Sequence, residues 1–148
     1  MAEIGFYHLT RSSLEQALPP LLGRTLEAGR RAVVRCADAG RVKELDETLW
    51  RSADPVWLPH GTAALGHAAL QPIWLTEGED APNGATFLFL VDGVACPDPK
   101  LFERIFDLFD GGDPEAVAGA RRRWTACREA GHSLVYWQQQ AKGWVKKA

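Results

Sequence analysis

The chain has 148 residues, of which 46% are hydrophobic and 24% are charged, which is the composition of an ordinary globular protein. The length predicts a single domain over residues 1–148, and the composition excludes collagen-like, coiled-coil and intrinsically disordered chains. Seventeen Lys and Arg against nineteen Asp and Glu give a formal net charge of −2. This balance disfavours nucleic-acid binding through the overall field, so any basic site must be local.

The cysteines and the N-terminal residues indicate the compartment. Cys36, Cys96 and Cys127 are odd in number and form no CxxC pair, which is typical of a reducing environment. The first residues lack a signal peptide, and no apolar stretch reaches the ~18 residues of a membrane span. We therefore expect a cytoplasmic protein without a membrane partner. Six tryptophans in so short a chain point to a binding surface.

The first part of the chain alternates strand and helix patterns. The elements predicted are a strand at 4–9, a helix at 13–28, a strand at 32–37 and a helix at 39–50. Within the first helix, Pro19 and Pro20 either produce a kink or mark the start of its regular part. Strands interleaved with helices over short connections predict an α/β fold with a mostly parallel central sheet flanked by helices.

The rest of the chain begins with residues 51–72, which contain several prolines and glycines and predict a long ordered loop. The elements predicted after it are strands at 73–76, 86–91 and 134–137, an acidic turn at 77–84 and a helix at 114–130. At 104–109 helix and strand compete, and the strand is favoured. For the basic tail over residues 141–148, the sequence leaves open whether the tail is flexible or ordered.

Nucleotide-binding and metal-binding patterns are weak. The sequence holds neither GxxxxGK[ST] nor GxGxxG after the first predicted strand, so a phosphate-binding loop is not expected. His60 and His67 lie in the predicted loop, where a metal or catalytic role needs a partner such as Asp54 or Cys96. A structural role is the commoner one for such isolated histidines.

Catalytic patterns are incomplete as well. Cys127 and His132 could act as nucleophile and base, but no third member or oxyanion-hole signature accompanies them. Asp46, Glu47 and Asp92 could coordinate magnesium, although solvated carboxylates are the ordinary explanation. We therefore predict no catalytic residues, no metal and no cofactor.

A basic and aromatic helix face is the strongest signal for binding. Arg121, Trp124 or Thr125, and Arg128 recur at three-, four- and seven-residue spacing, so they share one face of the helix predicted at 114–130. Two guanidiniums beside an indole can hold a carboxylate while an apolar side chain packs against the ring. Nucleic-acid phosphate is a competing ligand, and an exposed charged helix with one packed tryptophan is the structural alternative.

Several motifs together resemble the chi subunit of bacterial DNA polymerase III holoenzyme. The motifs are Phe6-Tyr7, L-D-E-T-L-W at 45–50, L-P-H at 58–60, A-R-R-R-W at 120–124 and R-E-A-G at 128–131. The resemblance spans essentially the whole chain. It implies a Rossmann-like fold without catalytic activity and an accessory role in the clamp-loader complex. It also implies two partners: the psi subunit, and the acidic, Phe-terminated tail of single-stranded DNA-binding protein, through which the association with single-stranded DNA is indirect.

The resemblance implies which residues hold that tail. Arg121 matches the principal arginine, Trp124 an aromatic position beside the pocket, and Arg128 a second basic position. A terminal phenyl ring requires an apolar slot, for which Trp124 and Phe109 are candidates. Val117 or one of its neighbours stands where the family has a lysine, one turn before Arg121. The candidates to compensate for that lysine are Arg122, Arg123 and Lys142.

The same resemblance places a second interface at Trp50, Trp57, Pro59 and His60, where the family meets psi. Trp50 has a core role as its alternative. Without psi, this surface would contact the clamp loader directly, self-associate or be closed by the long loop.

Together these partners predict a non-catalytic adaptor that links the clamp loader to single-stranded DNA-binding protein. Two other functions are alternatives to this adaptor role. One is a small α/β enzyme using His60 or Cys127, and the other is direct binding of single-stranded nucleic acid through residues 121–123 and 142–147.

Overall fold

The computed structural model describes residues 3–52, 57–64 and 66–148. The strands are β1 (Glu3–Leu9), β2 (Ala32–Arg35), β3 (His60–Thr62), β4 (Ile73–Thr76), β5 (Phe87–Leu90), β6 (Arg104–Asp110), β7 (Ser133–Gln140) and β8 (Gly143–Lys146). The helices are α1 (Leu14–Glu27), α2 (Ala39–Trp50) and α3 (Pro114–Glu129), with short 3₁₀ turns at Ala68–Leu70 and Pro99–Leu101. No helix among these described residues is both long and apolar enough to cross a bilayer.

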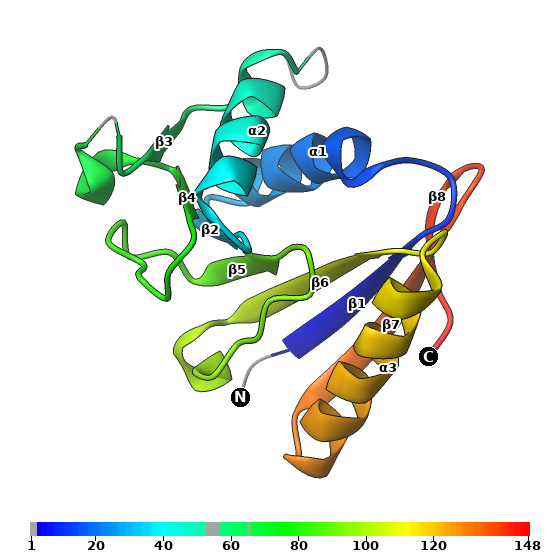
Figure 1. Cartoon of the computed structure of the whole chain (residues 1–148). Coiled ribbons are helices and arrows are strands. Elements are labelled where there is room, and N and C mark those ends of the chain that lie inside the picture. The colour runs from blue at the N-terminus through cyan, green and yellow to red at the C-terminus, as the bar shows by residue number, and fades with distance from the viewer. Residues whose placement is uncertain (1–2, 53–56, 65) are drawn as a thin grey trace.

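All the strands form one sheet in the order β3-β4-β2-β5-β6-β1-β7-β8. Every neighbouring pair is parallel except β7 and β8, which are antiparallel. Figure 1 shows α1 and α2 on one side of this sheet and α3 on the other. The predicted α/β class, with a mostly parallel sheet flanked by helices, is confirmed. The Rossmann-like arrangement stays a prediction.

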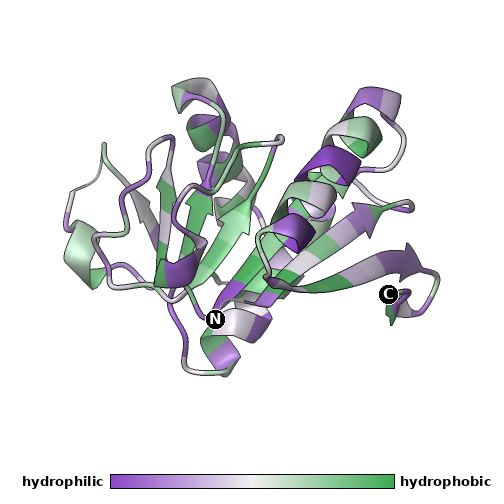
Figure 2. Cartoon of the chain, turned by 90° about the horizontal axis from the view of Figure 1, so that it is seen from below, coloured by the Kyte–Doolittle hydropathy of each residue, from purple (hydrophilic) through white to green (hydrophobic). Residues whose placement is uncertain are grey.

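Apolar side chains fill both sides of the sheet. On the side of α1 and α2, Leu18 and Leu45 pack with Tyr7 of β1, and on the side of α3, Ala120 packs with Phe6 of the same strand. Successive side chains of a strand point to opposite faces, so β1 contributes to both layers. Figure 2 shows the central strands predominantly green, as expected for strands that are covered on both faces.

One predicted boundary is wrong, and the structure decides the order of the basic tail, which the sequence left open. Residues 51–72 are not only loop, because β3 pairs in parallel with β4. The basic tail is not free, because β8 pairs with β7 and the Trp144 ring packs against Tyr7 at a centroid distance of 5.1 Å. Lysines are typical of a solvated tail, but one half-buried ring and the pairing with β7 hold this segment in place.

The start of α1 decides between the two alternatives for its prolines. Ser13 caps the helix by accepting a hydrogen bond from the Gln16 backbone N–H, while the Gln16 side chain accepts one from the Ser13 N–H. This reciprocal pair satisfies two otherwise free donors, so the helix begins at Leu14. It continues through Pro19 and Pro20, and the alternative in which its regular part begins at Pro19 is wrong.

A buried ion pair anchors α3 to the sheet. Arg123 Nε and Nη2 donate hydrogen bonds of 2.7 and 2.9 Å to the two carboxylate oxygens of Asp107 on β6. Asp107 is only 2% exposed. Burial raises the pKa of Asp107, while the hydrogen bonds and the charge of Arg123 oppose that rise. The two-point contact therefore fixes both the position and the rotation of α3 on the sheet.

Breaking this pair from one side should destabilise the protein strongly. We expect Arg123→Leu to lower the free energy of unfolding by about 3–5 kcal/mol, because it leaves a buried carboxylate without a partner. The measurement is urea denaturation followed by circular dichroism. The double variant Asp107→Leu/Arg123→Leu should recover much of the loss, since it removes both charges. A single variant as stable as wild type would contradict this role.

Candidate functional site

A hollow of about 430 Å³ lies between α3 and the strands β1, β6 and β7. We call it the α3 hollow. Its lining residues are Phe6, His8, Phe109, Val117, Ala120, Arg121, Trp124, Thr125, Arg128 and Tyr136. The structure thus brings together all five residues that the sequence assigned to tail binding, including Phe109 from a different element.

The spacing along α3 explains which of its residues reach the hollow. The helix begins at Pro114, where Asp113 accepts a hydrogen bond from the Glu115 backbone N–H. Val117, Arg121 and Arg128 then recur at four and seven residues, close to whole helical turns, and share one face. Arg123 lies off this face, where it contacts Asp107. The buried pair therefore turns the Arg121 face toward β1 and β7.

Aromatic rings form the apolar part of the hollow. Trp124 meets the edge of Phe6 at a centroid distance of 5.3 Å and the edge of Tyr136 at 6.4 Å. His8 stacks on Phe109 at 4.9 Å. Rings from one helix and three strands therefore enclose a space suited to a flat or apolar group.

Arg121 and Arg128 supply the positive charge. Both side chains are exposed, and within the described part of the chain neither forms an ion pair with an acid. Their guanidiniums are therefore not neutralised by internal carboxylates. An anionic group at the rim of the hollow would meet two free fork-shaped donors.

His8 and Tyr136 belong to the hollow but were missed in the sequence. His8 Nδ1 and the Tyr136 hydroxyl are hydrogen-bonded at 2.6 Å. Burial and the nearby charge of Arg121 lower the pKa of His8, so the ring is neutral near pH 7. The alternation of side chains along β1 could have shown that Phe6 and His8 lie on the same face of the strand. That Tyr136 and Phe109 lie beside them follows only from the parallel register of β1 with β7 and β6. Register between distant strands leaves no local pattern.

The three candidates to replace the missing lysine lie elsewhere. Arg123 is a wrong candidate, because Asp107 binds its guanidinium. Arg122 lines a separate crevice at the carboxyl edge of the sheet. Lys142 lies in the turn between β7 and β8. None of the three lines the α3 hollow, so Arg121 and Arg128 carry its positive charge.

The second predicted interface presents two exposed indoles. Trp50 is 57% exposed and Trp57 is 69% exposed, so the core alternative for Trp50 is wrong. The Trp50 ring rests on His60 at 4.8 Å. His60 itself is buried, with Nδ1 donating to the Leu58 carbonyl and Nε2 lying 2.9 Å from Asp46 Oδ1. His60 therefore supports this surface from beneath, while Pro59 is half-buried beside it.

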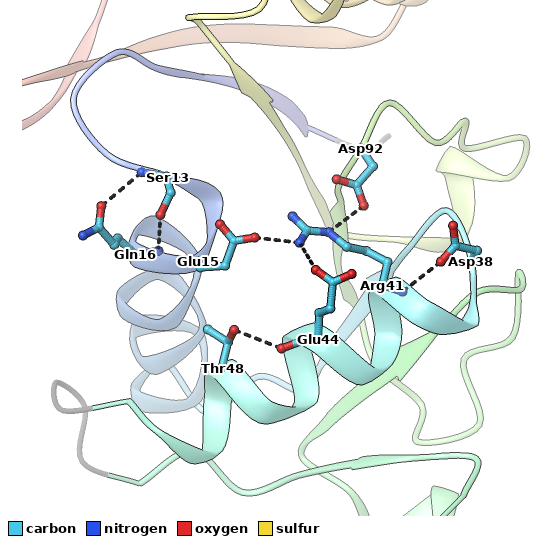
Figure 3. A network of polar contacts seen from close by, with 8 residues as sticks. All are labelled: Ser13, Glu15, Gln16, Asp38, Arg41, Glu44, Thr48 and Asp92. Carbon is cyan, nitrogen blue, oxygen red and sulfur yellow. Dashed lines mark hydrogen bonds and ion pairs between the residues drawn. The ribbon is translucent and has the colours of Figure 1, made fainter.

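The carboxylates weighed as magnesium ligands have other partners. Figure 3 shows Arg41 at the centre of a network in which its guanidinium contacts Glu15, Glu44 and Asp92. Asp46 contacts His60. Among the described residues, no three His, Cys, Asp or Glu side chains gather as a metal site would require. Asp54, the partner considered for His60, lies outside the described residues.

Cys127 does not behave as an activated nucleophile. It packs against the core on the α3 side, and burial raises the pKa of its thiol. A raised pKa lowers the fraction of thiolate, which is the reactive form. Its environment thus fits a packing role.

Comparison with known proteins identifies the family. Residues 1–135 match the family described as DNA polymerase III chi subunit, HolC. The chain belongs to this family. The family match covers all of α3 and ends inside β7, so β8 lies beyond it.

A probable DNA polymerase III subunit chi from Rickettsia prowazekii (strain Madrid E) is similar to this chi-family chain. The two are 24% identical over 91 residues, which is 62% of this chain and 55% of that protein. The chain thus aligns with little more than half the length of this relative.

The charge of Arg121 should be measurable at His8. Replacing Arg121 by alanine removes a cation that disfavours the imidazolium, so we expect the pKa of His8 to rise toward its ordinary value while burial still holds it low. NMR titration of the ring protons measures the change, and a His8→Gln variant assigns the resonance among the four histidines. An Arg51→Ala variant serves as a distant control. An unchanged His8 pKa in Arg121→Ala would contradict the geometry described here.

Proposed function

We propose that this chi-family protein is a non-catalytic adaptor that links the polymerase III clamp loader to single-stranded DNA-binding protein. The adaptor binds the acidic, Phe-terminated tail of that protein in the α3 hollow. The observation that carries the proposal is the pair of guanidiniums, Arg121 and Arg128, beside an apolar space, neither of them in an ion pair with an acid of the described residues.

The chemistry of the tail matches the hollow in two parts. A terminal carboxylate takes the two-point hydrogen bonds that Arg121 can donate, and neighbouring aspartates take Arg128. The terminal phenyl ring takes the space between Trp124, Phe109 and Val117. Because His8 is neutral, it adds to the aromatic lining and not to the charge. A bare phosphate would use only the arginines and leave the apolar space empty.

Trp50 and Trp57 form the surface that we assign to psi or, where psi is absent, to a clamp-loader subunit. Two large exposed rings on neighbouring segments are typical of the centre of a protein interface. With tail binding on α3 and this surface at the end of α2, one chain would hold two partners at once.

Arg121 is the test of tail binding. We expect Arg121→Ala to weaken binding of a synthetic aspartate-rich peptide ending in phenylalanine by roughly tenfold to a hundredfold, since charge-assisted hydrogen bonds contribute ~1.5–3 kcal/mol. Isothermal titration calorimetry measures the affinity. Arg51→Ala removes an equal charge from an exposed site at the end of α2 and should bind as wild type does.

The peptide itself supplies a second control. Amidation of its C-terminal carboxyl should cost affinity in wild type but little more in Arg121→Ala, because the two changes remove the same contact. Added salt should weaken binding through the charged part alone. Equal affinities of wild type and Arg121→Ala for the free-acid peptide would sink the proposal.

A further inference from the structure

A second hollow lies on the face of the sheet opposite α3. Its volume is about 320 Å³, and we call it the α1 hollow. Its lining residues are Tyr7, Leu21, Arg24, Thr25, Ala28, Phe87, Arg104, Phe106, Trp137 and Trp144. The two tryptophans come from β7 and β8, after the last residue that the family match covers. None of these lining residues has a part in the proposed adaptor role.

Aromatic rings form the floor and one wall of the α1 hollow. The Tyr7 ring lies near-parallel to Phe106, at 5.3 Å and 29°, and to Trp137, at 6.1 Å and 14°. Trp144 stands edge-on to Tyr7 at 5.1 Å and 84°. Gly5 makes this possible, because a Cβ there would lie 2.7 Å from Tyr7 Cε1. The absence of a side chain at Gly5 therefore lets the Tyr7 ring lie over the backbone of β1.

Cations surround these rings. The Arg104 guanidinium lies 4.6 Å from the centre of the Phe106 ring and donates a 3.4 Å hydrogen bond to the Tyr7 hydroxyl. Arg24 reaches the hollow from the last turn of α1. No carboxylate lines the hollow, and the only acid that contacts Arg104 among the described residues is Glu3, whose Oε1 lies 3.7 Å from Nε.

The register of β7 with β8 places a third cation, Lys146, on this face of the sheet. Lys146 on β8 is directly opposite Trp137 on β7, and directly paired residues of antiparallel strands project from the same face. Because Trp137 lines the hollow, the Lys146 side chain is on that face too. The α1 hollow is thus an aromatic space lined by Arg24 of α1 and Arg104 of β6, with Lys146 of β8 on the same face of the sheet.

We propose that the α1 hollow binds single-stranded nucleic acid, with one base against the half-buried indoles of Trp137 and Trp144 and with Arg24, Arg104 and Lys146 at the phosphates. Stacking on aromatic rings beside cationic side chains is the general way in which proteins hold single strands. The volume is near the lower limit of small-ligand pockets, about 300 Å³, so it accommodates a single base and not a folded element.

The surrounding strands favour a nucleotide over a peptide. An extended peptide adds to a sheet through a free strand edge, which here is the outer edge of β8, the last strand of the sheet. The hollow lies on the face of the sheet beside that edge, where β1 is paired on both sides by β6 and β7, so a ligand in the hollow approaches through the face. The indole N–H of Trp137 is buried without an acceptor among the described residues, which leaves an unmatched donor in the wall.

Binding of a fluorescently labelled oligothymidylate about 20 nucleotides long, which exceeds the usual site size, tests the proposal. Fluorescence anisotropy at low salt should show Arg24→Glu and Lys146→Glu each weakening binding by roughly tenfold. Trp144→Leu should weaken it as well, whereas Trp144→Phe should retain most of the affinity. Arg51→Glu makes the same change in net charge away from the hollow and should bind as wild type does.

A duplex of the same length separates base insertion from charge alone. Its bases are stacked inside the helix, so wild type should bind it more weakly than the single strand. Thermal melting of each variant shows that it is folded, and the two charge reversals act at the surface, where folding is least affected.

Three results would overturn the proposal. One is equal binding of duplex and single strand. Another is wild-type affinity for the single strand in both Arg24→Glu and Lys146→Glu. The last is a loss of affinity for the aspartate-rich peptide in Arg24→Glu while oligothymidylate binding is unchanged, which would mark a peptide site. Arg121→Ala should leave oligothymidylate binding intact, so failure of the adaptor role and failure of this inference are distinguishable.

Discussion

The ion pair between Asp107 and Arg123 determines what α3 presents to solvent. Successive residues of a helix are about 100° apart, so three consecutive arginines cannot face the same way. With Arg123 held by a buried carboxylate, Arg121 is turned toward the α3 hollow and Arg122 toward the crevice at the carboxyl edge of the sheet. This one internal contact therefore gives three identical side chains different places. Arg123 anchors α3 to the sheet, Arg121 lines the α3 hollow and Arg122 lines the crevice.

Strand β1 connects the two faces of the molecule. Phe6 and His8 line the α3 hollow, while Tyr7 lies between them in the chain and lines the α1 hollow. Because the strand is paired on both sides, its backbone has little freedom to shift. The two hollows are therefore formed on a common rigid element, and a ligand in one is separated from a ligand in the other by the thickness of the sheet.

Helical spacing predicted the part of the α3 hollow that lies within one element. Arg121, Trp124 and Arg128 share a face because 3.6 residues make a turn, and this is visible in the sequence. His8 and Tyr136 could not be predicted in this way, since they meet through the pairing of β1 with β7, more than 120 residues apart. Strand β8 could not be predicted for the same reason. Its lysines are typical of a solvated tail, and the contact of Trp144 with the Tyr7 ring joins residues far apart in the sequence.

The distribution of charge matters more than its sum. A net charge of −2 means that the arginines at both hollows are offset elsewhere, in part by the acids around Arg41. A protein with a strong positive field would bind any exposed DNA phosphate through counterion release, whatever its shape. Here the cations are local and each group adjoins an apolar space, so a ligand gains the full interaction only when it supplies a negative group and a ring together. For the adaptor role proposed above, that requirement separates a Phe-terminated acidic tail from the phosphates of the DNA it accompanies.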